Sequence, residues 1–596
     1  MKKGLAIIYC IFLVISLSSC SREKAAMPSN PAFGYLRAFG GIFNEYPSKI
    51  FPLEDGSFYA VATTYSPAET GDVPKSCRFR TSEILTSLGN PEDLFRKSDV
   101  WIFRVDPSKP HERQITYSRC FGGSGCEEAH SSCITEDGQI IVGALSESDD
   151  GDLSGEPKGK KSWLFRVDPK REWSEQITYS QSFGEREIKQ INDVKSLSKD
   201  IAYVYSLSMG NGHLYTLRIF DLSKDRRQNP AFSRDILSSD RTTMRDMPLF
   251  VRNKMILSDD GAATIVVSLD KDSIQNPEKG GAPLRINRKV SYREEKAGKR
   301  DRSPAANAPL TDKGTRMKRS SGKDFTEYLD VLVLSLDPKL PKEKWITSSK
   351  ILGGSGMDFA PSIAKSKNGE FFVSFLSAST DGDLRGAGGN GSSSLLAVFK
   401  ARPEPPGGMR TEPVGFLRAP EKAFLGLYDM ASDGGGKVGI MCMLKRQSVQ
   451  NETGAEKAAD AGSRDYRNVV QLKIEDPEEN PHGKKTGLID IVLLDSEKKA
   501  AAQKNFRVDS DLFYSLAISG SSLFFMAGSF TPPDERDMPH YKLSYLESYL
   551  SKDSPSAMFD PNNKFKISKL FSTELAVGIL DVKNMEGASF GKGKAK

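Results

Sequence analysis

The chain has 596 residues, of which 38% are hydrophobic and 27% are charged. These proportions are ordinary for a globular protein, and the length suits several domains or one large repeat array. The net charge of +6 excludes a protein that is basic throughout, because residues 279–323 alone hold fourteen basic and four acidic residues.

The first residues have the features of a targeting segment. Two lysines precede the apolar run of residues 6–17, which is too short to span a bilayer comfortably. The run ends in Leu17-Ser18-Ser19-Cys20, which resembles the lipobox of bacterial lipoproteins. The alternative is an ordinary secretory signal with a chance cysteine.

The lipobox resemblance implies a signal peptide over residues 1–19, lipidation of Cys20 (palmitate among its acyl chains) and a tether over residues 20–31. No other run approaches the length of a membrane-spanning helix, so the mature chain is expected to be anchored to the cell envelope through this lipid. Ser21 follows the cysteine, which by resemblance to Gram-negative lipoproteins favours the outer membrane; the leaflet stays open.

One unit recurs along the rest of the chain. Residues 120–168 and 351–400 both contain a Gly-Gly-Ser-Gly turn, an alternating strand, an Asp-Gly or Asn-Gly hairpin, a second strand, a Gly-Asp-Leu loop and a final apolar strand. The glycine turn precedes the hairpin turn by fifteen residues in four places: Gly40 to Asp55, Gly122 to Asp137, Gly184 to Lys199 and Gly353 to Asn368. Equal spacings indicate that one supersecondary unit is reused.

In chain order, the pattern predicts seven units of four short strands with period-two alternation. Several units close on an alternating strand that ends in Asp-Pro, as in residues 99–107 and 468–477. Trp101 and Trp163 hold matching places and are expected to pack between neighbouring sheets. The predicted blades lie near residues 32–107, 111–169, 174–222, 232–338, 344–402, 412–477 and 487–582, with a flexible tail at 583–596.

These units predict an all-β fold, a seven-bladed β-propeller of four-stranded antiparallel blades over residues 32–582, with six or eight blades as alternatives. A single sheet cannot bury both of its faces, whereas radial stacking and ring closure bury them and protect the edges. The GGSG, Asp-Gly and GDL motifs resemble the propeller repeats of secreted and surface-anchored bacterial proteins. That resemblance implies a fold and an envelope setting, but no catalytic residues.

A long insertion in the fourth blade, residues 276–324, is basic, rich in Pro, Gly and Ala, and predicted to be disordered. It could bind an anionic surface or an acidic partner, or be a tolerated solvated loop. Nucleic acid is not an expected partner, because aromatic residues are almost absent. The candidate contact residues are Arg285, Arg288, Lys289, Arg293, Lys299, Arg300, Arg302, Arg316, Lys318 and Arg319.

Two further sets of residues are candidates for a bound ion or a covalent bond. Clustered carboxylates in the GDL loops could bind Ca²⁺, or could cap their own backbone in tight turns; they are Asp149, Asp150, Asp152, Asp381 and Asp383. An oxidising compartment permits a disulfide among Cys77, Cys120, Cys126 and Cys133, with buried free thiols as the alternative. No other metal site and no other cofactor is expected.

The five histidines lie in different units, and no linear catalytic motif is present. The sequence therefore favours a monomeric, non-catalytic scaffold that binds an envelope protein. The alternative is an envelope hydrolase or lyase that acts on a glycan or a lactone at the propeller channel, since blades distant in sequence can assemble a site at one channel mouth. An enzyme should then show polar side chains converging there.

Overall fold

The structure is a computed structural model of the whole chain. It describes residues 34–41, 44–69, 71–79, 97–209, 213–224, 230–239, 254–270, 329–341, 344–379, 381–385, 387, 395–404, 407–418, 423–446, 469–471, 487–495, 500–508, 514–529 and 574–581. Within these residues every helical segment is a short 3-10 turn, and none is long and apolar enough to cross a bilayer.

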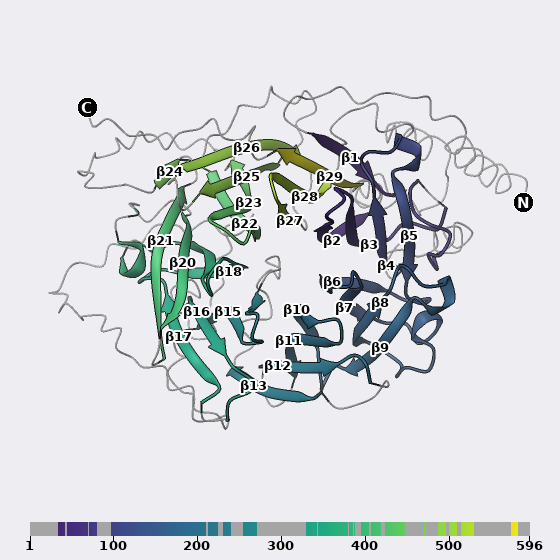
Figure 1. Ribbon diagram of the computed structural model, residues 1–596, viewed down its shortest axis with the longest axis horizontal. Coiled ribbons are helices and arrows are strands. Elements are labelled where there is room, and N and C mark those ends of the chain that lie inside the picture. The colour runs from purple at the N-terminus through teal and green to yellow at the C-terminus, as the bar shows by residue number, and fades with distance from the viewer. Residues whose placement is uncertain are drawn as a thin grey trace, which may run out of the picture.

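Seven antiparallel sheets stand around a central axis (Figure 1), which confirms the predicted seven-bladed β-propeller. The first three blades are β2 (Glu45–Pro52), β3 (Phe58–Thr64), β4 (Asp99–Val105) and β5 (Ile115–Phe121); β6 (Glu127–Ile134), β7 (Ile140–Ser146), β8 (Lys161–Val167) and β9 (Ile177–Gly184); and β10 (Gln190–Ser198), β11 (Ile201–Met209), β12 (His213–Asp221) and β13 (Phe232–Ser239).

The next three blades are β14 (Met255–Leu257), β15 (Ala263–Asp270), β16 (Leu329–Leu336) and β17 (Ile346–Leu352); β18 (Asp358–Lys365), β19 (Phe371–Ser377), β20 (Leu395–Glu404), β21 (Gly408–Arg418) and β24 (Val469–Gln471); and β22 (Ala423–Ser432), β23 (Lys437–Arg446), β25 (Gly487–Asp495) and β26 (Ala500–Val508). The seventh blade contains β27 (Tyr514–Ser519), β28 (Ser522–Ser529), β29 (Glu574–Asp581) and β1 (Tyr35–Phe39).

The seventh blade closes the ring with strands from both ends of the described chain. Strand β1 pairs antiparallel with β29, and Tyr35 lies opposite Ile579. Because β1 supplies the outer strand of the last blade, separating it from β29 would open the ring at this point. The two chain ends thus hold each other through a ladder of main-chain hydrogen bonds.

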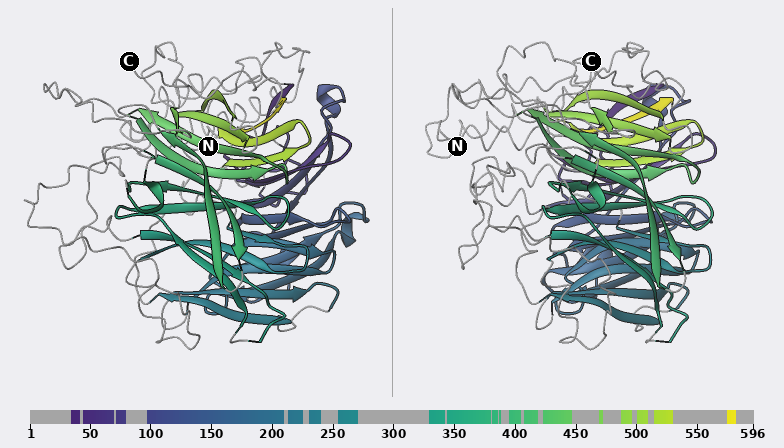
Figure 2. Two further views of the ribbon diagram at one scale, coloured as in Figure 1. Left: turned by 60° about the vertical axis from the view of Figure 1, so that its left-hand side comes forward. Right: turned by 90° about the vertical axis from the view of Figure 1, so that its left-hand side faces the viewer.

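The blades pack face to face, as the edge-on views show (Figure 2). Strands β3, β8, β16 and β19 are buried along their whole length, because both faces of each sheet are covered by neighbouring blades. Trp101 lies in one core cluster with Phe524 and Val577 of the seventh blade, and Trp163 lies in one with Val61 of the first blade. The expectation that both tryptophans pack between sheets is confirmed.

The predicted blade ranges are offset by one strand from the sheets of the structure. The range 111–169, for example, joins β5 of the first blade to three strands of the second. The sequence unit starts at the strand after each Asp-Pro turn, but that strand completes the preceding blade. The offset arises because β1 fills the outer position of the seventh blade, so every later outer strand belongs to the blade before it.

The prediction that residues 468–477 close the sixth blade is wrong. Residues Val469–Gln471 form β24, which pairs parallel with β21 and gives the fifth blade a fifth strand. The third strand of the sixth blade is β25, which contains the apolar run GLIDIVLLD. Both runs are rich in β-branched residues, so composition alone did not distinguish them.

The two ends of the ring differ in the length of their connections. The second and third strands of each blade join at the end where the innermost strands begin, and so do successive blades. Every stretch of more than ten undescribed residues between two described strands starts and finishes at this end, at 80–96, 240–253, 271–328, 447–468, 472–486 and 530–573. We call it the insertion end; short hairpins such as Asp137-Gly138 lie at the opposite, hairpin end.

Candidate functional site

The Gly-Gly-Ser-Gly turns lie at the insertion end and present four consecutive backbone N–H groups. In the turn at residues 122–125, side chains accept a hydrogen bond from each of the four. The acceptors, in order, are Asp152 Oδ2 (3.0 Å), Glu127 Oε2 (2.9 Å), Asp150 Oδ1 (2.7 Å) and Ser148 Oγ (2.7 Å). The GDL loop therefore folds back onto the glycine turn of the same blade junction.

The second copy repeats this geometry at residues 353–356. The acceptors are Asp383 Oδ2 (3.3 Å), Asp358 Oδ2 (2.8 Å), Asp381 Oδ1 (2.6 Å) and Ser379 Oγ (2.9 Å). The first unit keeps part of it, because the amide of Gly41 donates to Glu45 Oε1 at 3.3 Å and that of Asp72 donates to the Gly40 carbonyl at 2.8 Å. The two motifs are thus halves of one structural unit, which we call the turn module.

The five aspartates predicted as calcium ligands have other partners in the structure. Four of them accept the backbone hydrogen bonds of the turn modules, and Asp149 lies 3.5 Å from Lys158 Nζ. Arg119 and Lys350 supply positive charge at 3.7 Å from Asp152 and Asp383. These contacts fit the alternative in which the aspartates fix tight turns.

Two buried carboxylates enclose the first glycine of each glycine turn. A Cβ atom on Gly122 would lie 2.4 Å from Glu127 Oε2 and 2.6 Å from Asp99 Oδ1, so only glycine fits between them. Gly353 is enclosed in the same way by Asp358 and Asp330. Burial raises the pKa of Asp99 well above its ordinary value and also raises the pKa of Glu127, since a second charge is costly in a site away from water.

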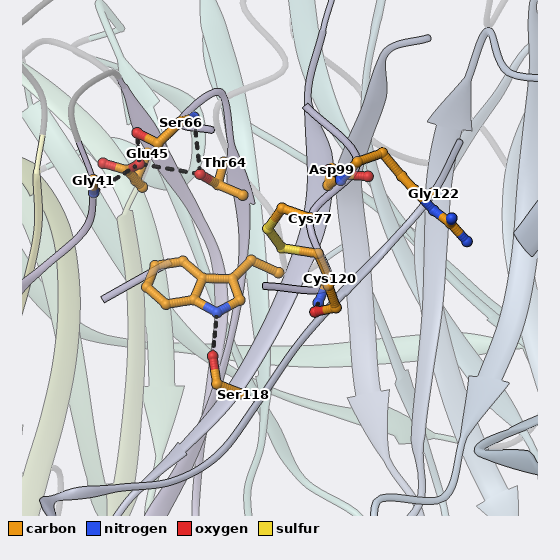
Figure 3. Close-up of a disulfide and its surroundings, with 12 residues drawn as sticks. Gly41, Glu45, Thr64, Ser66, Cys77, Asp99, Ser118, Cys120 and Gly122 are labelled. Carbon is orange, nitrogen blue, oxygen red and sulfur yellow. Dashed lines mark hydrogen bonds between the residues drawn. A yellow bond between two sulfur atoms is a disulfide. The ribbon is translucent and has the colours of Figure 1, made fainter. Parts of the chain in front are cut away.

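Cys77 and Cys120 form a disulfide beside Asp99 (Figure 3). Among the residues described, these three are the one group of close metal-ligating side chains, and the bond between the two sulfur atoms already occupies two of them. Cys126 and Cys133 are free thiols, and burial raises the pKa of each to about 12. Cys20 and the ten basic residues proposed for anionic contacts lie outside the described residues.

Seven polar residues at equivalent positions of the innermost strands surround the axis, and the sequence reading missed them. We call this set the inner ring. In five blades a β-bulge directly precedes the inner-ring residue. In four blades the inner-ring residue lies seven positions before the hairpin glycine, and this spacing is the sequence signal that could have identified the set. The members, in blade order, are Lys49, Ser131, Asp193, Lys254, Ser362, Asp429 and Ser515.

Inner-ring side chains of the second, sixth and seventh blades tie the innermost strand to that of the next blade. Ser131 Oγ accepts from Val194 N at 3.0 Å, Asp429 Oδ2 from Leu516 N at 2.8 Å, and Ser515 Oγ from Ile50 N at 3.2 Å. An innermost strand has a free edge, so these contacts satisfy main-chain donors that no strand pairs. The inner ring is therefore first a structural device.

Titratable side chains also gather at the insertion end between the first two blades. Tyr65 donates to Glu128 Oε1 at 2.7 Å, His130 Nε2 lies 3.7 Å from Glu128 Oε2, and Cys126 Sγ lies 3.8 Å from Glu128 Oε1. The ring of Tyr46 meets that of Tyr65 edge-on at 5.4 Å. We call these five residues the mouth cluster.

Glu128 is the ionised centre of the mouth cluster. Its interactions with the His130 imidazole and then the Tyr65 hydroxyl lower the pKa of Glu128 to about 2. Burial, followed by the negative charge of Glu128, raises the pKa of Tyr65. The arrangement can therefore hold a carboxylate against a phenol and an imidazole, which is a set of groups able to move a proton. Of the described histidines, His111 and His213 lie elsewhere, in the 3-10 turn η1 (His111–Arg113) and in β12.

Comparison with known proteins assigns the chain to no family. No protein-family model and no curated protein matches the chain. Among solved structures, the chain is similar to the phage phi92 endosialidase (9% identity, TM-score 0.34, covering 95% of this chain and 72% of that one). It is also similar to a protein of unknown function from Dyadobacter fermentans (8%, 0.34, 92% and 98%) and to an α-L-arabinofuranosidase from Fusarium graminearum (9%, 0.29, 93% and 99%). At such TM-scores these likenesses carry no argument about function.

Proposed function

We propose that this propeller is a lipid-anchored protein of the bacterial envelope that binds a protein partner through its insertion end. The observation that carries the proposal is the asymmetry of the ring: every long connection between described strands leaves from one end, and the other end has tight hairpins. Connections on a rigid scaffold are where propellers and other repeat folds vary their binding surfaces. A partner that contacts several of them meets one continuous face.

The position of the basic segment adds a charge argument. Residues 276–324 belong to the connection between β15 and β16, whose anchoring residues Asp270 and Leu329 stand at the insertion end. A partner with an acidic surface is favoured there, because opposite charges steer association. Cys20 would hold the propeller at the membrane, consistent with the lipobox resemblance.

Crosslinking in intact cells, followed by purification of the lipidated protein and mass spectrometry, tests this proposal. We expect a stoichiometric envelope protein that is lost when residues 278–322 are deleted. The matched control replaces residues 225–229 of the hairpin end by Gly and Ser, and should keep the partner. Recovery of the propeller alone, or equal loss with both variants, would reject the proposed binding end. Loss of palmitate labelling in Cys20→Ala tests the anchor separately.

The mouth cluster favours a second candidate, a hydrolase or lyase acting on a glycan or a lactone. The mouth cluster brings a carboxylate, a phenol and an imidazole together at one end of the ring, which is the convergence of titratable groups that an enzyme would need. Turnover of an envelope glycan or lactone panel by the purified protein, abolished in Glu128→Gln and kept in Glu112→Gln, would support it. Absence of turnover across the panel by the folded protein would count against it.

A further inference from the structure

We propose that the centre of the inner ring binds a small oxyanion, with the ammonium groups of Lys49, Lys195 and Lys254 as its ligands. Such an anion would be a phosphate-like or dicarboxylate species, recognised by charge and by several oxygen acceptors. This inference does not depend on the proposed partner-binding end, because it concerns the axis of the ring and not its insertion face.

The three lysines come from different blades and surround the same pair of aspartates, Asp193 and Asp429. Lys49 extends from the first blade past the seventh, and its Nζ reaches Asp429 Oδ2 of the sixth blade at 3.1 Å. Lys195 Nζ lies 2.8 Å from Asp193 Oδ1 in the third blade. The charges of Lys195 and Asp193 act on Lys49, and the charge of Asp193 also acts on Lys254, so Asp193 is a shared electrostatic neighbour of all three lysines. Lys254 occupies the same inner-ring position as Lys49, in the fourth blade.

The two carboxylates of this group have little capacity left for another cation. Asp193 accepts from Ser131 Oγ and Lys195 Nζ on one oxygen, and from the amides of Lys254 and Met255 on the other. Those four hydrogen bonds use the roughly four acceptor sites of a carboxylate. Asp429 accepts from Lys49 Nζ and Leu516 N on Oδ2, and from Met430 N on Oδ1.

Lys254 is therefore a surplus cation in a partly buried setting. Among the described residues, its ammonium group has no hydrogen-bond or ion-pair partner, while its backbone amide binds Asp193. Three ammonium groups beside two carboxylates leave one positive charge uncompensated. Burial lowers the pKa of Lys254 and of Lys49, and a bound anion would offset that effect by favouring the charged forms.

The lysines also explain why the anion should be small and oxygen-rich. An ammonium group carries three donors in a compact head, so a tetrahedral or dicarboxylate anion can accept from more than one lysine at once. Lys49 pairs with Asp429 and Lys195 pairs with Asp193, and the backbone amide of Lys254 also binds Asp193. A chloride ion would satisfy charge, but it would not bridge the donors of three blades in the same way.

The test uses the full-length protein in detergent, with phosphate, malonate and chloride at equal ionic strength. We expect phosphate or malonate to raise the unfolding temperature, and ³¹P line broadening of phosphate to report saturable binding. Lys254→Gln should weaken binding about tenfold, the loss of roughly one hydrogen-bonded charge contact. Lys254→Arg should retain binding, and the hairpin-end control Lys170→Gln should match the wild type.

Two results would overturn the proposal. The first is an unfolding temperature and a phosphate line width in the wild type that do not distinguish phosphate or malonate from chloride. The second is a Lys254→Gln variant that binds phosphate as tightly as the wild type, which would place any anion elsewhere, for example on the basic segment. Deleting residues 278–322 should leave the signal unchanged.

Discussion

The junction between the first and second blades and the junction between the fourth and fifth blades contain the same turn module. Their four amide hydrogen bonds, their enclosed glycines and their buried carboxylates correspond one to one. The first junction has two additions, the Cys77–Cys120 disulfide and the mouth cluster. The shared module already fixes the turn at both junctions. The disulfide and the mouth cluster therefore have roles beyond fixing the turn, and the second junction lacks those roles.

The largest expected effect comes from removing the disulfide, which the fourth and fifth blades do without. Replacing Cys77 and Cys120 together by alanine releases a cross-link that spans 43 residues. The chain-entropy model puts the loss of unfolding free energy at about 4 kcal/mol. Urea unfolding with and without reductant measures it: reductant should shift the midpoint of the wild type and leave that of the double variant unchanged. A shift in the variant would assign the redox sensitivity to another part of the chain.

The second prediction tests whether the two modules are equivalent. Gly151 has φ +62°, and a Cβ there would lie 2.5 Å from the Gly122 carbonyl oxygen; Gly382 has the same φ and a 2.3 Å approach to Gly353. Gly151→Ala and Gly382→Ala should each cost about 3 kcal/mol through backbone strain and overpacking. Gly155→Ala is the matched control, with φ +87° and open space around it.

Thermal or urea unfolding of these three glycine variants gives the comparison. The control should lose only about 1 kcal/mol, because strain acts there without a clash. A large difference between Gly151→Ala and Gly382→Ala would mean that the two turn modules contribute unequally to the free energy of unfolding. Equal small losses in all three variants would mean that the backbone contact at the modules relaxes easily.

The sequence predicted the repeated parts of the molecule better than the unrepeated parts. Equal spacings identified the propeller, the hairpins and the packing of Trp101 and Trp163, because a repeated local pattern reports a repeated local structure. The blade boundaries were out of phase, since the pairing of β1 with β29 joins residues more than five hundred positions apart. No local pattern encodes that contact.

The candidate sites show the same limit. The sequence offered backbone capping as one role for the carboxylates of the GDL loops, but it did not identify the glycine turn as the donor, because Ser124 and Asp150 meet only when the turn and the loop fold together. The inner ring was missed for a related reason. Lys49 and Asp429 come from blades almost four hundred residues apart, and each looks like an ordinary strand residue in its own unit.

The third prediction concerns the aspartates themselves. Asp150→Ala and Asp381→Ala each remove the acceptor of a serine amide, at 2.7 and 2.6 Å, and should each cost about 1.5 kcal/mol. Asp149→Ala is the control from the same loop, because an exposed ion pair contributes little. Calorimetry should also show no Ca²⁺-dependent rise in unfolding temperature. A rise in the wild type that Asp150→Ala abolishes would restore calcium as a ligand.

The smallest expected effect is a pH dependence at the first junction. Asp99 Oδ2 accepts from the Arg78 amide at 2.8 Å, while Asp99 Oδ1 faces Glu127 without a hydrogen-bond partner. The folded pKa of Asp99 is raised, chiefly by burial. Its neutral form therefore contributes stability that is fully present below the unfolded pKa near 3.9 and is lost as the pH rises through the folded pKa.

Asp99→Asn keeps the shape of that neutral form at every pH. We expect the variant to match the wild type near pH 4 and to exceed it by about 1 kcal/mol near pH 8, because no second buried charge develops beside Glu127. Unfolding midpoints across this range measure the difference, with Asp149→Asn as the exposed control. If Asp99→Asn instead loses stability as the pH rises, the Asp99 carboxylate is ionised and paired, and the junction depends on its charge.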